Sequence, residues 1–342
     1  MFDMYPFSSD NIEAAVASLK NYLVEEARAS KTDMLPLYAD IKPELSSFPD
    51  IKAVFFDIYG TLIISAAGEV GSAKEIAKEK REMQQEESDG DPQLFSSVLE
   101  RLGFSVESTA GYRAEELYLE GIKKSHMELR QKNIVYPEVN IIEIWYRLLA
   151  ILVDEGLIRE ESVPGRFGSN SFNKLKISIQ AAFFYEISVN TASPMPNAEE
   201  MIKLLSTNNF FLGIISNAQF YTPLLLEALF GKSPDKLGFD EELCNWSWRL
   251  REAKPSQELF KSPLEKLSSH RGISPKEVLY IGNDMRNDIL PAKEAGCKAV
   301  LFAGDKRSLR LREDDETLRS IRPDGVITDL AQLREIIPGL QV

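Results

Sequence analysis

Asp57 stands directly after the apolar run Val54–Phe56, and a Gly-Thr turn follows at residues 60 and 61. The apolar run, with Ala53 before it, predicts a buried parallel strand. Asp57 would then lie at the carboxyl end of that strand, where open α/β sheets bind their ligands. A carboxylate in such a place does not serve packing. It needs a partner cation, a metal ion or a substrate.

Polar groups also follow other predicted strands, or stand in the loops just after them. They are Ser216, Lys254 and the pair Asp284 and Asp288, and long stretches of sequence separate them from Asp57. A parallel sheet would bring such residues together along one edge. The chain has only two histidines. Any chemistry is therefore expected to rest on carboxylates, hydroxyls and lysine.

The composition is that of an ordinary globular protein and excludes several classes of partner. The chain has 342 residues, a net charge of −13 and 44% hydrophobic residues. This length predicts about two domains, and the acidic balance argues against nucleic acid or an anionic membrane surface as a partner. No apolar run reaches the ~18 residues of a membrane span. Cys244 and Cys297 lack metal-ligand spacing, so we expect reduced thiols in a cytoplasmic protein.

Strand and helix patterns alternate on either side of a long helical stretch. Strands are predicted at 53–56, 210–215, 243–248, 278–281, 299–302 and 325–328. Helices are predicted between them at 198–205, 223–230, 256–267 and 289–295. This order predicts an α/β fold with a Rossmann-like, doubly wound parallel sheet.

The helical stretch is predicted to be an all-α domain inserted into the α/β domain. Amphipathic or charged helical patterns cover 72–87, 92–102, 114–129, 141–153 and 173–189, and a small β excursion is expected within 62–70. The predicted domains are an N-terminal helical extension at 1–50, a core at 51–66 and 194–342, and the insertion at 67–193.

Four motifs, in this order, resemble those of the haloacid dehalogenase (HAD) superfamily of hydrolases. They are Asp57-x-Tyr-Gly-Thr-Leu, Ile-Ile-Ser216-Asn217, Lys254-Pro255 and Ile-Gly-Asn283-Asp284-x-x-x-Asp288. The helical insertion stands where this superfamily has its helical cap. The resemblance implies a hydrolase with Asp57 as the nucleophile.

The residue types suit the roles that the resemblance implies. The Asp57 carboxylate would form a covalent ester or acyl phosphate that water later cleaves. Lys254 would neutralise Asp57 and the bound anion, and Ser216 and Asn217, with the N–H groups after them, would hold the substrate oxygens. Thr61 can hydrogen-bond back into the turn after Asp57.

Magnesium is the cofactor that the resemblance implies, because a Mg²⁺ ion can bridge an attacking carboxylate and a phosphate. The expected ligands are Asp57, the main-chain carbonyl of Tyr59 and a carboxylate from residues 283–288. Either Asn283 or Asp284 occupies the position of the usual aspartate. Charge favours Asp284, with Asp288 in the same loop.

Tyr59 is the main departure from the phosphatase pattern. HAD phosphatases usually carry a second aspartate there, which protonates the leaving group, and a phenol with an ordinary pKa near 10 replaces it poorly. Asp-x-Tyr-Gly-Thr-Leu is instead the pattern of 2-haloacid dehalogenases, which need neither that acid nor a metal. The retained aspartates in 283–288 favour a Mg²⁺-dependent phosphatase of a small phosphorylated metabolite. A 2-haloacid dehalogenase and a weakly active ligand-binding protein stay as alternatives. The sequence does not indicate the oligomeric state.

Overall fold

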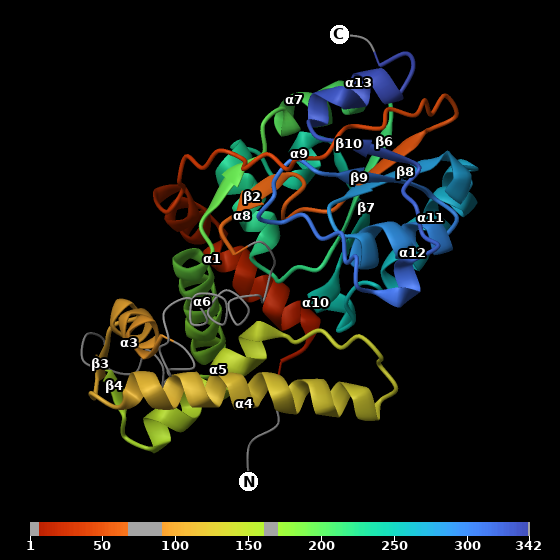
Figure 1. Cartoon of the computed structure of the whole chain (residues 1–342). Coiled ribbons are helices and arrows are strands. Elements are labelled where there is room, and N and C mark those ends of the chain that lie inside the picture. The colour runs from red at the N-terminus through yellow and green to blue at the C-terminus, as the bar shows by residue number, and fades with distance from the viewer. Residues whose placement is uncertain (1–6, 68–90, 161–169, 341–342) are drawn as a thin grey trace. The chain divides into compact units, whose positions relative to one another are not determined.

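The computed structural model describes residues 7–67, 91–160 and 170–340. The chain divides into two compact units, which we describe separately (Figure 1). The helical unit comprises Met1–Ser30, Gly71–Asn133 and Val139–Thr191, and the core unit comprises Lys31–Val70, Ile134–Glu138 and Ala192–Val342. The helix expected at 72–87 lies outside the described residues.

The helical unit is built from amphipathic helices that bury apolar faces against one another. Its helices are α1 (Ser9–Ala29), α3 (Pro92–Arg101), α4 (Ala110–Gln131), α5 (Ile141–Asp154) and α6 (Ser171–Val189). Their core includes Phe95, Trp145 and Phe183, all nearly inaccessible to solvent. The unit also contains an antiparallel pair, β3 (Phe104–Val106) and β4 (Ile158–Glu160). The unit is otherwise helical, as expected of the insertion, and strands of three residues are too short to leave a periodic pattern in the sequence.

The core unit contains a six-stranded, entirely parallel sheet, as the alternating pattern predicts. Its strands are β1 (Ala53–Phe56), β6 (Phe211–Ser216), β7 (Phe239–Trp246), β8 (Val278–Gly282), β9 (Lys298–Phe302) and β10 (Gly325–Ile327). Their order is β10-β9-β8-β1-β6-β7. β1 is therefore central, with Phe56 opposite Ile214 on one side and Ile281 on the other. Parallel neighbours in register place the carboxyl ends of β1, β6 and β8 together.

Helices follow the strands and cover both faces of the sheet (Figure 1). They are α7 (Ala198–Thr207), α8 (Thr222–Phe230), α9 (Pro234–Leu237), α10 (Ser247–Leu250), α11 (Glu258–Arg271), α12 (Leu290–Glu294) and α13 (Leu333–Ile336). Short 3₁₀ turns lie at Pro275–Glu277, Glu316–Leu318 and Leu330–Gln332, and a π turn lies at Met285–Ile289. The β excursion after the first strand is β2 (Ile63–Ser65), which pairs with β5 (Ala192–Pro194).

Side chains alternate across the central strand and bury a core on each face. Phe55 packs in one apolar cluster with Phe260 of α11 and Ala292 of α12. Val54 and Phe56 point to the opposite face, because successive residues of a strand alternate. All four residues of β1 are fully buried, so this strand is a rigid support for whatever follows it.

The segment after α1 belongs to the core unit, so the predicted single extension over 1–50 divides at Ser30. Glu44 exchanges backbone hydrogen bonds of 2.8 and 2.9 Å with Val326 of the edge strand β10. The Phe48 N–H donates to the Ile336 carbonyl over 2.7 Å. Prolines at 36, 43 and 49 prevent this stretch from continuing the helix, so its backbone groups bond to the core instead.

Among the described residues, the structure has no helix long and apolar enough to cross a bilayer.

Candidate active site

Asp57 is the first residue beyond β1, at the edge where the carboxyl ends of the central strands meet. Its N–H donates to the Ile281 carbonyl over 2.9 Å, which continues the pairing of β1 with β8. The residue is only 6% exposed. A carboxylate as buried as this needs a charged or hydrogen-bonding partner.

Lys254 supplies that partner. Its Nζ lies 2.7 Å from Asp57 Oδ1 and 2.5 Å from Asp288 Oδ1, and it also donates to the Tyr280 hydroxyl over 3.2 Å. Burial opposes the charge on this ammonium, but the attraction of Asp288 and Asp57 outweighs burial, so the pKa of Lys254 is raised. Lys254 therefore carries its charge at neutral pH and joins two carboxylates from different loops.

Asp288 is held by donors on both of its oxygens. Oδ1 accepts from Lys254 and from the Tyr280 hydroxyl, and Oδ2 accepts from the N–H groups of Asn283 and Asp284, each at 2.9 Å. Burial raises the pKa of Asp288, and the nearby negative charge of Asp57 adds to this, while Lys254 acts against it. A Cβ at Gly282 would lie 2.4 Å from the Asp288 carboxyl carbon, so only glycine permits this approach.

Asp284 is engaged away from this cluster. Its carboxylate caps the next turn by accepting from the N–H groups of Arg286 and Asn287, and Arg312 Nη2 lies 2.7 Å from its Oδ2. Among the described contacts, it makes none with Asp57 or Lys254. The geometry thus gives Asp284 a capping role and a local ion pair.

Asn283 joins the loop after β8 to the loop after β1. Its Oδ1 accepts from the Thr61 hydroxyl over 3.1 Å, and its Nδ2 donates to the Ser308 carbonyl. Gly60, at φ +81°, completes the contact, because a Cβ there would lie 2.3 Å from Ser308 Cβ. Thr61 and Asn283 therefore fix these two loops against each other.

Tyr59 is buried, and its hydroxyl lies 2.9 Å from Thr222 Oγ1 at the first turn of α8. This contact fixes the Tyr59 phenol. In the sequence, Tyr59 stands at the position where HAD phosphatases usually have an aspartate.

Ser216 and Asn217 follow β6. Ser216 is fully buried, and its hydroxyl makes a 3.3 Å contact with the Asn217 carbonyl. The Asn217 side chain accepts the Lys254 N–H over 2.7 Å. Hydrogen bonds thus join Asp57, Lys254, Asp288, Asn217, Asn283 and Thr61 in one network. The side chains of Tyr59 and Ser216 bond instead to Thr222 and to the Asn217 carbonyl, and the Asp284 carboxylate turns to Arg312.

The oxygens that a Mg²⁺ ion would need are largely taken. Both oxygens of Asp288 have two donors each, and Asp284 is committed to its cap and to Arg312. No group of three or more His, Cys, Asp or Glu that could hold a metal is found in 7–67, 91–160 and 170–340. The predicted ligand set, with Asp284 as a second carboxylate, therefore does not fit this arrangement. Asp57, Asn283 and the Tyr59 carbonyl offer one negative charge between them.

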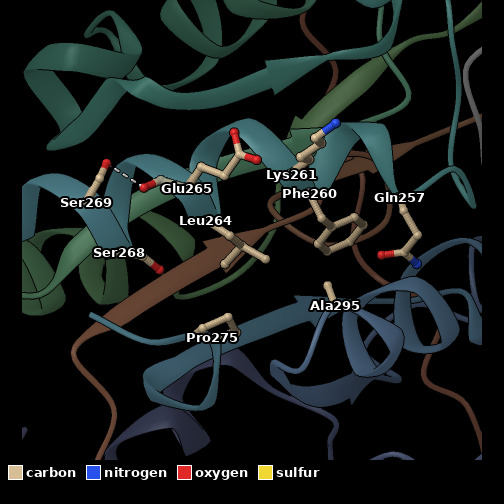
Figure 2. Close-up of a pocket in the computed structure, with 9 residues that line it drawn as sticks. All are labelled: Gln257, Phe260, Lys261, Leu264, Glu265, Ser268, Ser269, Pro275 and Ala295. Carbon is tan, nitrogen blue, oxygen red and sulfur yellow. Dashed lines mark hydrogen bonds between the residues drawn. The ribbon is translucent and has the colours of Figure 1, made fainter. Parts of the chain in front are cut away.

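A separate groove lies between α11 and the segments that carry Pro275 and Ala295 (Figure 2). Phe260 and Leu264 point from the helix toward Pro275 and Ala295, and the groove has a volume of about 690 Å³. None of the predicted site residues lines it.

Several residues of the network escaped the sequence reasoning. Tyr280 is one of them, and a single polar group within the apolar strand Val-Leu-Tyr-Ile-Gly is the signal that could have found it. Arg312 and Ser308 carry no such signal, because they stand in loops without a pattern and reach the site only through the fold.

Comparisons with known proteins give a family and a range of relatives. The family model for haloacid dehalogenase-like hydrolases matches residues 51–296. A phosphoglycolate phosphatase of Mannheimia succiniciproducens is 31% identical over 158 residues, which is 46% of this chain and 63% of that protein. A phosphoglycolate phosphatase of Escherichia coli O157:H7 is 24% identical over 75% of this chain and 82% of its own length. The chain covers less than two thirds of the Mannheimia protein and only 30% of a phospholysine phosphohistidine inorganic pyrophosphate phosphatase of Xenopus laevis.

Two solved structures that align with this chain have lower sequence identity to it than these relatives. A 2-haloacid dehalogenase of Pseudomonas syringae aligns over 84% of this chain and 97% of its own, with 19% identity and a TM-score of 0.49. A predicted phosphoglycolate phosphatase of Haemophilus somnus aligns over 85% of this chain and 99% of its own, with 18% identity and a TM-score of 0.42. With the family match covering well over half of its length, the chain belongs to the haloacid dehalogenase-like hydrolases.

Proposed function

We propose that this hydrolase is a phosphatase that acts on a small phosphorylated metabolite through an aspartyl phosphate on Asp57. The observation that carries the proposal is the buried Lys254 ammonium, 2.7 Å from the Asp57 carboxylate at the ligand-binding edge of the sheet. The relatives named as phosphatases support this choice over other hydrolase chemistry.

The reaction takes two displacements. A carboxylate oxygen of Asp57 attacks phosphorus, the bond from phosphorus to the ester oxygen breaks, and the leaving oxygen takes a proton from water. The hydroxide left from that water, or a second water that gives the hydroxide a proton, then attacks the phosphorus of the acyl phosphate, which releases inorganic phosphate and restores the Asp57 carboxylate. Lys254 keeps the nucleophile in place and lowers the repulsion between it and the phosphate. Ser216 and the N–H groups after it would hold the oxygens that are not displaced.

The phenol at position 59 sets the leaving groups that this mechanism can handle. A positioned acid contributes typically about 10²–10⁴-fold in rate when the leaving group is a poor one, such as an alkoxide. Tyr59 is held by Thr222 and has no carboxyl group. We therefore expect aryl phosphates, whose leaving groups are stable anions, to turn over about 10²–10⁴-fold faster than alkyl phosphates of similar size.

Mg²⁺ stays a prediction from the family resemblance. The carboxylates of Asp284 and Asp288, which were expected to bind it, are engaged elsewhere in the structure.

Hydrolysis of 2-haloacids is a second candidate, and a specific observation favours it. The Asp57 carboxylate is already neutralised by Lys254, and the residue two places on is a tyrosine. Halide leaves without a proton, so displacement of a halide by Asp57 would need neither an acid at position 59 nor a metal ion.

The test compares the two reactions in one preparation. Phosphate release from an aryl phosphate with Mg²⁺ present should be measurable, and Asp57→Asn should lower it by at least about 10³-fold. Chloride release from 2-chloropropionate should stay at background in the presence of a chelator. No phosphate release across a broad panel of phosphate esters would contradict the phosphatase proposal. Chloride release that Asp57→Asn abolishes would establish the second candidate instead.

A further inference from the structure

A short piece of the chain between two helices of the helical unit belongs to the core unit. The chain leaves the helical unit after Asn133, contributes Ile134–Glu138 to the core unit, and returns to the helical unit at Val139. We call residues 134–138 the passage segment. It lies between α4 and α5, so its sequence is part of the insertion, yet its contacts are with the core.

The passage segment pairs with the residues that lead into Lys254. The Ala253 N–H donates to the Tyr136 carbonyl over 2.7 Å, and the Glu138 N–H donates to the Arg251 carbonyl over 3.0 Å. Pro137 and Glu252 form an antiparallel bridge between these bonds. The backbone immediately before Lys254 is therefore anchored to a piece of the insertion.

The Glu138 side chain reaches the loop after β6. Its Oε1 accepts from Gln219 Nε2 over 3.0 Å, and its Oε2 accepts from the Ser247 hydroxyl over 2.7 Å. Gln219 is 3% exposed and Ser247 is fully buried, so the donors of both bonds are buried, while Glu138 itself is half-buried. Charge-assisted hydrogen bonds in such surroundings are stronger than neutral ones.

Glu138 also decides which way the Ser247 hydroxyl points. Ser247 Oγ lies 2.9 Å from the Ala218 N and 3.1 Å from the Ala218 carbonyl oxygen, and a hydroxyl has one proton to donate. When that proton goes to the Glu138 carboxylate, the lone pairs of the oxygen are left to accept the Ala218 N–H. Without the carboxylate the proton can turn to the Ala218 carbonyl, and the hold on the Ala218 N–H weakens.

Ala218 lies next to the residue that binds the main chain of Lys254. Asn217 Oδ1 accepts the Lys254 N–H over 2.7 Å. Lys254 is thus held from one side by the loop that Glu138 fixes, and from the other by the bond from Ala253 to the passage segment. The Lys254 Nζ contacts Asp57 at 2.7 Å and Asp288 at 2.5 Å at the same time. A small displacement of the Lys254 backbone would therefore break one of these contacts.

We propose that Glu138 is a positioning residue, supplied by the insertion, that sets the place of Lys254 and of the oxygen-holding loop at 216–217. It does not touch the reacting atoms, and acts through Ser247, Ala218 and Asn217. The kinetic part of this proposal rests on the phosphatase function proposed above.

Glu138→Gln is the first test, because glutamine keeps the length of the side chain but replaces one acceptor oxygen with a donor. We expect kcat on an aryl phosphate to fall about 10–10²-fold, since a displacement of 1 Å can have that effect, while KM and the melting temperature change little. Glu143→Gln is the matched control. Glu143 lies five residues further along, in α5, and pairs with Arg147 at 2.6 Å. An unchanged kcat in Glu138→Gln, or an equal loss in Glu143→Gln, would overturn the proposal.

A double-mutant cycle with Ser247→Ala tests the route of the effect. If Glu138 acts through the Ser247 hydroxyl, the double variant should lose no more kcat than the stronger single variant. Losses that multiply would overturn the proposal, because Glu138 would then act independently of Ser247.

Hydrogen exchange tests the same proposal without any turnover, so failure of the phosphatase function and failure of this inference can be told apart. Protection of the Ala218 and Lys254 amides should fall at least about 10-fold in Glu138→Gln and stay unchanged in Glu143→Gln. The Asp57 amide, which bonds to Ile281, should stay as protected as in the wild type. No change at Ala218 and Lys254, or an equal loss at all three amides, would overturn a positioning role.

Discussion

Replacing Lys254 with methionine isolates the contribution of the buried ammonium to the candidate site. Methionine has a similar length and an apolar terminus, so it fills the space without its charge. The change leaves Asp57 and Asp288 facing each other with their common partner gone, and the Tyr280 hydroxyl loses a donor. The structure therefore predicts loss of both stability and activity.

The size of the stability loss follows from burial. The Lys254 side chain is 3% exposed, and the side chains of Asp57 and Asp288 are 9% and 2% exposed. Removal of one partner from a buried ion pair costs about 3–5 kcal/mol, because the remaining charge is left unpaired. For a domain of this size, that corresponds to a fall in melting temperature of roughly 6–20 °C.

The loss should depend on pH in a direction that the carboxylates determine. Burial raises the pKa of Asp288 from 3.8 to about 7, and Lys254 acts against this rise. A carboxyl whose pKa is raised in the folded state loses stability as pH increases from its unfolded pKa through its folded pKa. Without Lys254 the rise in this pKa is greater. The unfolding free energy of Lys254→Met should therefore differ least from that of the wild type close to pH 4.5, and most at pH 8. The Lys254 charge itself is constant over this range, because its pKa is raised from an already high value.

Urea unfolding, followed by circular dichroism at pH 4.5 and pH 8, measures the loss of unfolding free energy and its dependence on pH. Lys261→Met is the control, because Lys261 lies 3.7 Å from Glu258 with both side chains more than half exposed. Its unfolding free energy should stay within about 0.5 kcal/mol of the wild type at either pH. A Lys254→Met protein within about 1 kcal/mol of the wild type at pH 8 would refute the buried triad and its role in holding Asp57.

Four further changes test other parts of the site. Tyr59→Asp should raise the rate on alkyl phosphates by about 10-fold or more, since it restores a carboxyl acid where the phenol stands, and a fall in rate would show that Tyr59 has a role of its own. Asn283→Asp should strengthen Mg²⁺ binding at least about 10-fold in isothermal titration calorimetry, because it adds a charged oxygen next to the loop that carries Asp57. Asp284→Asn should leave Mg²⁺ binding unchanged and lower the unfolding free energy by about 1.5–3 kcal/mol, because the buried carboxylate loses the charge that bonds to Arg312. Gly60→Ala should lower the unfolding free energy by more than about 2 kcal/mol in urea titrations, because the residue has φ +81° and a new Cβ would meet the Ser308 side chain.

The sequence predicts the parallel core well, because most of its strands are short apolar runs that end at a polar residue or a turn. The exception is the edge strand β7, which begins at Phe239 and not at the predicted residue 243, because its first half carries three acidic residues. Asp57 and Lys254 could be placed on one sheet edge from that pattern alone, and the structure puts them 2.7 Å apart. The role of Asp284 depends on local structure that the sequence pattern does not show. Asp284 was favoured for its charge, but it stands at the start of a turn where two free N–H groups bind it first. Glu138 could not be predicted, because nothing in a loop between two helices indicates which domain it will contact.

The charge balance of the site shows why the phosphatase and the dehalogenase are such close alternatives. When both carboxyl groups are ionised, Asp57, Lys254 and Asp288 together carry one negative charge, and the pair of Asp284 and Arg312 carries none. A monoanionic 2-haloacid meets little repulsion from such a cluster, and Lys254 can stay between its two carboxylates while halide leaves. A phosphate dianion meets more repulsion. It must either draw Lys254 away from Asp288 or bind together with a cation. Competition between Asp288 and the substrate for the Lys254 ammonium therefore decides which reaction the site favours.

On this reasoning, Asp288→Asn should favour phosphate turnover over halide turnover, because it frees Lys254 for the dianion. A larger loss of phosphate turnover than of halide turnover in that variant would refute the argument.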